Sequence, residues 1–496
     1  MIHKGLLGLL LLFAQQTFAE VAPLTETPPQ NTSKAKAELT LTVNNRNAVV
    51  CSNFVQNCTI NIGTSGCVNP PGFITVTNNS LVNARNITAS STDANYLNNV
   101  SQNNGCPAIL RPKASCSISF ISNNPNAFYI PNVVVQGSNT NAAFFNMNAL
   151  QCSTPQTGAL EPIPGSPFIT GGDPSNLAAT PNSQFLYVAN LSGGATGYSI
   201  APTTGVLTPV SGSPFNPGNQ YSGIAISPNG QYVYYTDFGN LNVAQFSINQ
   251  TTGFLSFIDN YEAGQGPAFI GLSPNGQFAY VANQNGGNVS AYTVDPTSGA
   301  LNQLSTSPYP AGGFSQPVGL VVTPNGQFLY VIDYAYGYIY GYTINQTTGE
   351  LSAMPDSPFT TGFYPGKIIT NSTGTLVYVA ANNGGGFKTM DYDTSVWVYS
   401  VNPTTGSLTD VTPTIISTAA SSIALTPDDK FAYVTNFNEN TINADSVDPI
   451  TGALSLLPNG PYATGNGPTA IIVTPNGSFV YVVNFNGSNI TGYSIH

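Results

Sequence analysis

One pattern recurs seven times between Pro174 and Ile495 and constrains the fold of this chain more than any other feature. Each copy places a turn such as Ser227-Pro228-Asn229-Gly230 before an alternating segment that ends in Tyr-Val-x-Asn or a close variant. Proline presets the second position of such a turn, and asparagine and glycine accept the left-handed residue that follows. A repeat of about 40–50 residues with four short strands per copy is typical of β-propeller blades.

The segments after these turns alternate aromatic or β-branched residues with small or polar ones, as half-buried strands do. We expect strands at residues 185–190, 232–237, 278–283, 328–333, 376–381, 431–436 and 479–484. The sequence therefore predicts an all-β chain that contains a seven-bladed β-propeller.

The last copy of the repeat ends at His496, before its fourth strand. The segment Thr157-Gly158-Ala159-Leu160 with Gly165-Ser166-Pro167-Phe168 repeats the pattern of residues 204–207 and 212–215. We expect 157–168 to supply the missing strand, because closing the ring removes two exposed sheet edges. On this reading the propeller spans 153–496, and 153–168 completes the last blade.

The Tyr-Val-x-Asn and Ser-Pro-Asn-Gly motifs resemble those of the seven-bladed lactonase-like propellers, also called the YVTN-repeat family. Tyr433-Val434-Thr435-Asn436 spells the repeat name, and the resemblance extends over residues 157–496. It implies the propeller fold and, by analogy, an activity similar to that of 6-phosphogluconolactonases or muconate-cyclising enzymes. Many proteins of this family are secreted or periplasmic.

The N-terminus predicts export from the cytoplasm. A short basic start with Lys4 precedes an apolar run at residues 5–13, and small residues lead to a cleavage site after Ala19. We predict a signal peptide at 1–19, with a buried N-terminal helix as the alternative, and a proline-containing linker at 20–37. No apolar run has transmembrane length, so we expect a secreted or periplasmic protein without a transmembrane segment.

Residues 38–152 predict a separate, disulfide-containing β domain. Short β-branched runs separated by Asn, Ser, Gly and Pro suggest an immunoglobulin-like sandwich, and the Cys106–Cys116 stretch resembles bacterial Ig-like domains. All six cysteines precede the repeats, and an even number behind a signal peptide indicates disulfides. Cys106–Cys116 is the favoured local pair, and one of Cys51, Cys58 and Cys67 is a candidate partner of Cys152. A metal site is the alternative, although no histidine accompanies these cysteines.

Charge separates the two predicted domains. Residues 153–496 contain three lysines, no arginine and 17 acidic residues, a formal charge of −14, whereas the preceding part has a charge of +3. An acidic propeller repels phosphate backbones, so we exclude nucleic acid as a partner. The opposite charges of the two parts favour docking of the two domains. The alternative is that the charge serves solubility alone.

The innermost strand of each blade lines the central channel of a propeller. Aligning the copies gives a ring at the channel mouth: Asn176, Gly223, Phe269, Gly319, Lys367, Ser422 and Ala470. Most members are small, as a crowded axis requires, and we expect Asn176, Phe269 and Lys367 to bind a ligand.

Departures from the repeat supply the remaining candidates. Asp237 and Asp333 replace the asparagine that usually ends the second strand, so with Lys367 they are candidate catalytic groups, and capping in place of asparagine is the alternative. The enlarged loop 382–396 contains Lys388, a candidate binding residue, together with Asp391 and Asp393. With Asp333, these two carboxylates are candidate Ca²⁺ ligands, and no other cofactor is expected.

Tyrosines on the same loop face complete the candidate binding residues, and they favour a carbohydrate or protein ligand: Tyr334, Tyr336 and Tyr364.

Three functions fit these observations. The first is an extracytoplasmic binding or interaction module. The second is a lactonase-type hydrolase, which needs a base to activate water and a cation or oxyanion hole for the developing charge. The propeller has no arginine, and its one histidine is the terminal His496, so the first reading is favoured and catalysis stays undecided. The third is a structural envelope protein, which the 6% of charged residues would suit.

Overall fold

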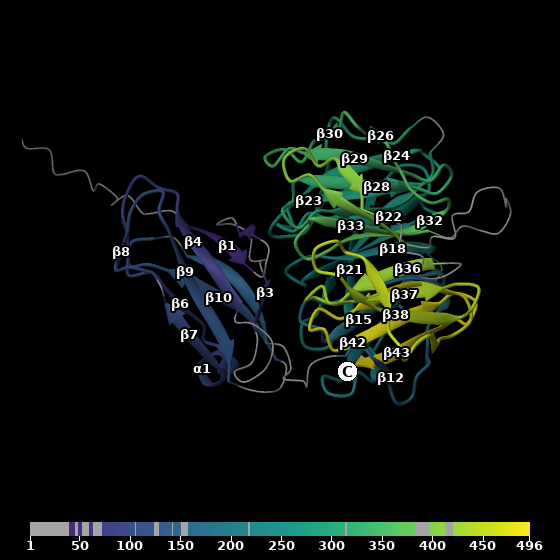
Figure 1. Cartoon of the computed structure of the whole chain (residues 1–496), viewed down its shortest axis with the longest axis horizontal. Coiled ribbons are helices and arrows are strands. Elements are labelled where there is room, and N and C mark those ends of the chain that lie inside the picture. The colour runs from purple at the N-terminus through teal and green to yellow at the C-terminus, as the bar shows by residue number, and fades with distance from the viewer. Residues whose placement is uncertain are drawn as a thin grey trace, which may run out of the picture. The chain divides into compact units, whose positions relative to one another are not determined.

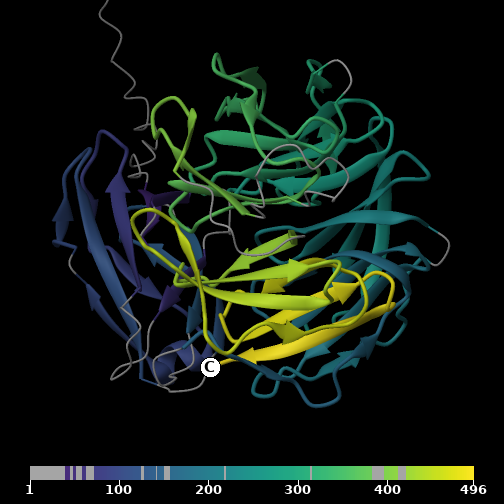
Figure 2. The same ribbon diagram turned by 45° about the vertical axis from the view of Figure 1, so that its right-hand side comes forward.

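The computed structural model describes residues 39–44, 48–51, 59–62, 72–104, 106–123, 128–140, 142–149, 157–216, 219–312, 315–381, 396–411 and 420–496. Nearly all regular elements in these ranges are strands, as the sequence predicts. The figures show two β-sheet parts, an N-terminal β domain and a propeller, which are described separately below (Figures 1 and 2). The predicted signal peptide and linker lie outside the described residues and remain predictions.

Two sheets form the N-terminal β domain. The first sheet has the order β2 (Ala48–Cys51), β1 (Leu39–Asn44), β4 (Gly72–Asn78), β9 (Ser115–Ser122) and β7 (Val100–Asn104). The second has the order β3 (Thr59–Ile62), β11 (Ala143–Ala149), β10 (Phe128–Gln136) and β6 (Thr88–Ser90). A pair formed by β5 (Ala84–Arg85) and β8 (Ile109–Leu110) and the helix α1 (Ala94–Asn99) complete the domain.

Both sheets of this domain contribute to one hydrophobic core. Phe120 of β9 and Phe145 of β11 meet there, with ring centroids 5.4 Å apart. The strands pair in an antiparallel manner except for β3, which runs parallel to β11. The domain is therefore an all-β, two-sheet unit, and the more specific immunoglobulin-like assignment remains a prediction.

The predicted disulfide between Cys106 and Cys116 is confirmed. Their sulfurs are 2.02 Å apart and their Cα atoms 4.9 Å apart, within the usual range for a disulfide. The Cys51 side chain and all of Cys58, Cys67 and Cys152 lie outside what the structure describes, so their pairing stays open.

Seven antiparallel sheets form the propeller. Blade one contains β14 (Gly172–Ala179), β15 (Phe185–Ser192), β16 (Gly194–Ile200) and β17 (Leu207–Pro209). Blade two contains β18 (Tyr221–Ile226), β19 (Tyr232–Asp237), β20 (Asn242–Ile248) and β21 (Leu255–Glu262). Blade three contains β22 (Pro267–Leu272), β23 (Phe278–Asn283), β24 (Asn288–Val294), β25 (Leu301–Gln303) and β26 (Tyr309–Pro310). Blade four contains β27 (Pro317–Val322), β28 (Phe328–Asp333), β29 (Tyr338–Ile344), β30 (Leu351–Ala353) and β31 (Phe359–Thr360).

The remaining blades follow the same plan. Blade five contains β32 (Pro365–Thr370), β33 (Leu376–Ala381), β34 (Val396–Val401) and β35 (Leu408–Asp410). Blade six contains β36 (Ala420–Leu425), β37 (Phe431–Asn436), β38 (Thr441–Val447), β39 (Leu454–Leu456) and β40 (Tyr462–Ala463). Blade seven contains β41 (Pro468–Val473), β42 (Phe479–Asn484), β43 (Asn489–Ile495), β12 (Leu160–Pro162) and β13 (Phe168–Ile169).

The last blade combines strands from both ends of the propeller. β12 pairs with β43 in antiparallel register, with Leu160 opposite Ile495, and β13 pairs with the start of the same strand. Each inner strand lies beside the inner strand of the next blade, and β41 lies beside β14. The ring is thereby closed, and no blade is left with an unpaired third strand.

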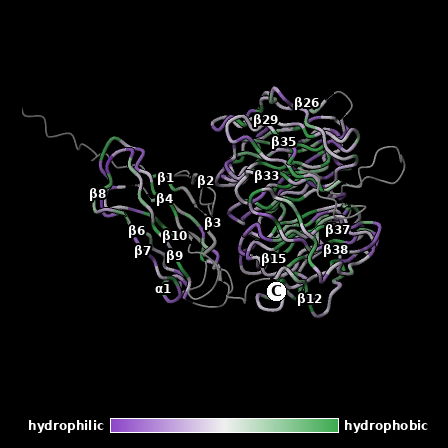
Figure 3. Tube along the Cα trace, in the orientation of Figure 1, coloured by the Kyte–Doolittle hydropathy of each residue, from purple (hydrophilic) through white to green (hydrophobic). Residues whose placement is uncertain are grey.

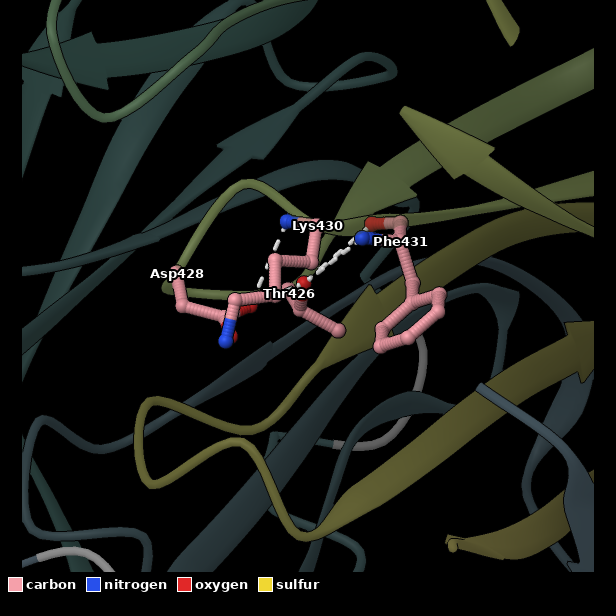
Figure 4. Close-up of polar contacts among 4 residues, drawn as sticks. All are labelled: Thr426, Asp428, Lys430 and Phe431. Atoms are coloured by element: carbon pink, nitrogen blue, oxygen red, sulfur yellow. Dashed lines mark hydrogen bonds and ion pairs between the residues drawn. The ribbon is translucent and has the colours of Figure 1, made fainter. Parts of the chain in front are cut away.

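A hydroxyl group organises the turn between the first two strands of six blades. In blade six, Thr426 Oγ1 donates to Asp428 Oδ1 at 2.7 Å and accepts from the Phe431 backbone N–H at 3.0 Å (Figure 4). Lys430 Nζ lies 2.9 Å from Asp428 Oδ2, on the same turn. The Thr/Ser-Pro-Asn motif is repeated because this bond satisfies a buried backbone donor in each blade. Equivalent bonds from the strand's first amide reach Thr180, Ser227, Ser273, Thr323 and Thr474.

Second-strand tyrosines join six of the seven blades to the next blade. Tyr187 Oη donates to the Gly253 carbonyl at 2.7 Å, and Tyr234 Oη donates to the Gly299 carbonyl at 2.6 Å. These glycines have positive φ and belong to the Thr-Thr-Gly or Thr-Ser-Gly turns, so two repeat motifs meet at every such contact. Hydrophobic residues follow the strands and polar residues the turns, and apolar clusters fill the spaces between blades (Figure 3). Within the described ranges, no helix has the length and apolar character needed to cross a membrane.

Candidate functional site at the channel mouth

A bulge interrupts every inner strand at the same point. The register between first and second strands shifts there in all seven blades, for example between Pro365 and Lys367. In four blades the bulged residue is a serine or threonine, and its hydroxyl group forms a hydrogen bond with the neighbouring inner strand. Ser222 Oγ, for instance, donates to the Pro267 carbonyl oxygen at 2.8 Å. A β-bulge changes the direction in which the next side chain points. The residues that directly follow the seven bulges are those of the predicted channel ring.

The ring is less uniform than the sequence suggests. Gly223, Gly319, Ser422 and Ala470 are buried, whereas Asn176, Phe269 and Lys367 keep partial solvent access. A Cβ atom at Gly223 would lie 2.8 Å from the Ala268 carbonyl oxygen. Glycine is therefore required at this position because the next blade approaches closely. Crowding at the channel axis, which the sequence suggests, is not the only reason.

Lys367 and Phe269 contact each other although they belong to blades five and three. Lys367 Nζ lies 4.6 Å from the centroid of the Phe269 ring, a distance at which a cation is attracted to the ring face. Gly319 has the same register position in the intervening blade and presents no side chain. Because Gly319 has no side chain, Lys367 and Phe269 can contact each other across the position of blade four in the channel ring.

Burial lowers the pKa of the Lys367 ammonium from 10.5 to about 8, because protein atoms replace the water that would solvate its charge. No carboxylate of the described residues forms an ion pair with Lys367, and burial is the only cause of its lowered pKa. A half-desolvated amine without a counter-ion favours the approach of an anionic ligand group.

The two candidate catalytic carboxylates are fully buried. Asp237 accepts hydrogen bonds from the backbone and side-chain nitrogens of Asn240 at 3.1 and 2.8 Å. Asp333 Oδ1 accepts from the backbone amides of Gln316 and Ala335, both at 2.9 Å. The asparagine of blade three makes a similar cap: Asn283 accepts from Gly264 N at 3.1 Å. The geometry thus favours the capping role, and neither aspartate is bonded to Lys367.

Aromatic side chains cluster on the loops of blades four and five. The rings of Tyr334 and Tyr364 have centroids 5.0 Å apart and planes inclined by 51°, and Tyr336 and Tyr338 stack at 6.3 Å. Tyr334 and Tyr364 are 40% and 39% exposed. These residues begin or follow strands that end at the channel mouth, so the structure gathers them on one face with Lys367.

The other candidate residues lie outside the described ranges or away from the channel mouth. Lys388, Asp391 and Asp393 lie outside the described residues. Among the residues that the structure describes, no three His, Cys, Asp or Glu side chains are arranged to hold a metal ion. His496 bonds to Glu161 at 3.1 Å and Ser494 at 2.9 Å beside the closing strand pair, so its ring is engaged there.

Sequence reasoning missed Asp445. It is fully buried in β38, both carboxylate oxygens lack a hydrogen-bond partner in the described part of the chain, and desolvation raises its pKa to about 7. In the other six blades the equivalent position, opposite the second residue of the second strand, carries an aromatic ring: Tyr198, Phe246, Tyr292, Tyr342, Tyr399 and Tyr493. Aligning the third strands in the same way as the second would have revealed this exception.

Comparison with protein families assigns the repeats. The sequence model of the lactonase, seven-bladed β-propeller family matches residues 209–314 and 314–496. The chain belongs to this family. A comparison with curated protein sequences finds no significant match.

Solved structures similar to this lactonase-family propeller have diverse roles. A proposed 6-phosphogluconolactonase of Bacteroides fragilis is 15% identical, with 73% of this chain and 99% of that chain covered and a TM-score of 0.53. A periplasmic gluconolactonase of Pseudomonas aeruginosa is 19% identical, with 60% and 86% covered and a TM-score of 0.51. Hydrazine synthase of Kuenenia stuttgartiensis is 17% identical, with 67% and 98% covered and a TM-score of 0.51. At these identities the likeness concerns the fold alone.

Proposed function

We propose that this lactonase-family protein is a secreted or periplasmic binding module that holds a carbohydrate ligand at the channel mouth, with an anionic group of the ligand at Lys367. The observation that carries the proposal is the Lys367–Phe269 contact, in which a desolvated amine has no acid or base partner among the described residues. At pH 7 such a group is mostly protonated and can bind a carboxylate by a charge-assisted hydrogen bond, whereas only its neutral form could accept a proton from water.

The charge of the propeller limits the size of the anionic ligand. A formal charge of −14 over residues 153–496 repels a long polyanion. At physiological ionic strength the repulsion is screened beyond about 8 Å, so a single carboxylate next to Lys367 experiences mainly the local positive charge. A sugar carrying one or a few carboxylates fits these conditions better than a charged polymer does.

Hydrolysis of a lactone is the second candidate, and the family match favours it. Against it, Asp237 and Asp333 are buried; Asp237 and the Oδ1 atom of Asp333 accept hydrogen bonds from loop amides, and Asp333 Oδ2 has no partner among the described residues. The loop 382–396 with Lys388 could contribute a group that the described residues lack. Turnover therefore has to be measured along with binding.

The test compares two lysines. We would measure binding of gluconate, glucuronate and galacturonate by calorimetry, and turnover of glucono-δ-lactone, with wild type, Lys367→Met and Lys430→Met. We expect wild type to bind an acidic sugar, Lys367→Met to lose at least about tenfold in affinity, and Lys430→Met to bind normally, since Lys430 pairs with Asp428 on the opposite end of the blade.

Turnover of the lactone by wild type that is absent in Lys367→Met would instead establish the hydrolase. Asp333→Asn serves as a further control, because a buried cap should alter neither binding nor turnover. Equal loss in Lys367→Met and Lys430→Met would show that net charge, not the channel mouth, governs binding.

A further inference from the structure

The backbone of Tyr364 is in an unusual conformation. Its φ is +54°, in the left-handed region that bulky residues rarely occupy. The equivalent residues of blades three and seven, directly before the inner-strand proline, are Gly266 and Gly467, with φ of +63° and +67°. Asp173 of blade one, directly before Pro174, also has a positive φ of +54°. The position is thus left-handed in four blades, and blade five fills it with the bulkiest of these residues, a tyrosine, where glycine would be relaxed.

Packing does not explain this choice. The Tyr364 side chain is 39% exposed, so burial of its ring offsets little of the backbone strain. Strain that the surrounding fold does not require points to a role at the surface. The ring lies beside Tyr334 of blade four, with centroids 5.0 Å apart and an inclination of 51° that leaves parts of both faces uncovered.

The loops that carry the two rings are held rigidly. The Tyr334 amide donates to the Gln316 carbonyl at 2.9 Å, and Asp333 Oδ1 accepts from the amides of Gln316 and Ala335. The Thr361 amide donates to the Gly337 carbonyl at 2.8 Å, which ties the segment before Tyr364 to the loop after Tyr334. The rings are therefore preorganised, and little conformational entropy is lost when a ligand binds between them.

We propose that Tyr334 and Tyr364 form a stacking subsite for one pyranose ring of the ligand, adjacent to and separate from Lys367. A pyranose presents an apolar C–H face to an aromatic ring and hydroxyls to its edge, and tyrosine matches both with its ring and its phenol group. This inference rests on the proposed function, since it assigns the sugar to a specific pair of residues.

A carbohydrate fits this patch better than a protein does. A stable protein interface buries about 800 Å² per partner around an apolar centre. On these loops the exposed large hydrophobic residue without a hydroxyl is Phe363, which is 63% exposed. Two tilted tyrosine rings correspond to the size of one or two sugar units.

The experiment measures affinity and thermal stability together. We would titrate wild type, Tyr364→Gly, Tyr364→Ala, Tyr334→Ala and Phe363→Ala with neutral and uronate-containing tetrasaccharides, and record Tm for each variant without ligand. We expect both Tyr364 variants and Tyr334→Ala to weaken binding of neutral and acidic sugars about tenfold. Phe363→Ala should bind like wild type.

Stability should separate the two Tyr364 variants. Tyr364→Gly relieves the left-handed strain and should raise Tm by about 2–4 °C, whereas Tyr364→Ala removes the ring and keeps the strain, so its Tm should not rise. A higher Tm with lower affinity in Tyr364→Gly would show that stability is sacrificed for binding.

Other outcomes distinguish this inference from the proposed function. Wild-type affinity in every tyrosine variant, with loss of acidic sugars in Lys367→Met, would overturn the stacking subsite and leave the binding module intact. Failure of wild type to bind any sugar of the panel would overturn both. Equal weakening by Phe363→Ala would point to a general apolar contact and also overturn the assignment.

Discussion

Tyr433 donates a 3.1 Å hydrogen bond to the carbonyl oxygen of Gly158, a residue 275 positions earlier in the chain. It is the same inter-blade contact that Tyr187 makes with Gly253, but here the acceptor belongs to the N-terminal segment that contributes β12 and β13. The ring is therefore held closed by side-chain contacts as well as by strand pairing, and both depend on residues 157–169.

Gly158 provides a test of this closure. Its φ is +75°, and a Cβ atom there would lie 2.4 Å from Phe431 Cδ1, whereas at Gly165, with φ +84°, the nearest atom would be 3.8 Å away. Gly165→Ala should cost about 1–2 kcal/mol through backbone strain alone. Gly158→Ala adds a clash in the core, so we expect a total loss of about 3 kcal/mol. Thermal unfolding should show a clearly larger fall in Tm for Gly158→Ala; equal shifts would contradict the role of this contact.

The tyrosine contacts between blades can be tested with a matched pair. Tyr330 Oη donates to the Gly406 carbonyl at 2.6 Å, whereas the buried hydroxyl of Tyr378 has no hydrogen-bond partner among the residues that the structure describes. Removing the hydroxyl in Tyr330→Phe leaves a buried acceptor unpaired and should cost about 1–2 kcal/mol. Tyr378→Phe should be neutral or slightly stabilising. Denaturant unfolding measures both, and a comparable loss in Tyr378→Phe would show that its hydroxyl is bonded in solution.

Internal repetition explains why so much of the propeller is readable from sequence. The expected strand at residues 278–283 coincides with β23, because the Ser-Pro-Asn-Gly turn and the terminal Asn283 both form specific hydrogen bonds that fix the strand ends. The N-terminal domain has no such repeat, so its strand order could not be derived. β3, for example, runs parallel to β11.

The site was only partly predictable. Lys367 and Phe269 could be placed in one ring by aligning inner strands, but their contact across blade four depends on side-chain reach and on Gly319. The aspartates were ambiguous because a capping aspartate and a reactive one look alike in sequence, and only burial distinguishes them. The strain at Tyr364 is a backbone property, visible in sequence only as a tyrosine where blades three and seven have glycine.

Asp445 makes stability depend on pH. Its carboxyl has a pKa of about 7 in the folded protein and about 3.8 when unfolded, because burial disfavours the charged form. Between these values the folded state binds more protons than the unfolded state, so stability falls as pH rises from about 4 to 7. The total effect is on the order of 4 kcal/mol. Tm should therefore be higher at pH 5 than at pH 8.

Substitution of Asp445 provides the control for that prediction. Asp445→Asn should flatten the change of Tm between pH 5 and pH 8, since the amide does not titrate. Asp445→Phe introduces the residue that blade two has at the equivalent position, Phe246, and should raise Tm at pH 8. An unchanged pH dependence in Asp445→Asn would assign the effect to another group.

Lys367 should also reduce stability at neutral pH. Its pKa is about 8 in the folded protein and about 10.5 when unfolded, so between these values the unfolded state binds more protons and stability rises with pH. Below pH 8 the desolvated ammonium destabilises the fold, offset in part by its contact with the Phe269 ring. Lys367→Met should therefore raise the free energy of unfolding at pH 7 by on the order of 2 kcal/mol and abolish the rise between pH 8 and 10. Denaturant unfolding at pH 7, 8.5 and 10 measures both effects, with the solvent-exposed Lys430→Met as the matched control. A loss of stability in Lys367→Met at pH 7 would mean that the cation–ring contact outweighs desolvation and that the channel mouth is built around a permanently charged lysine.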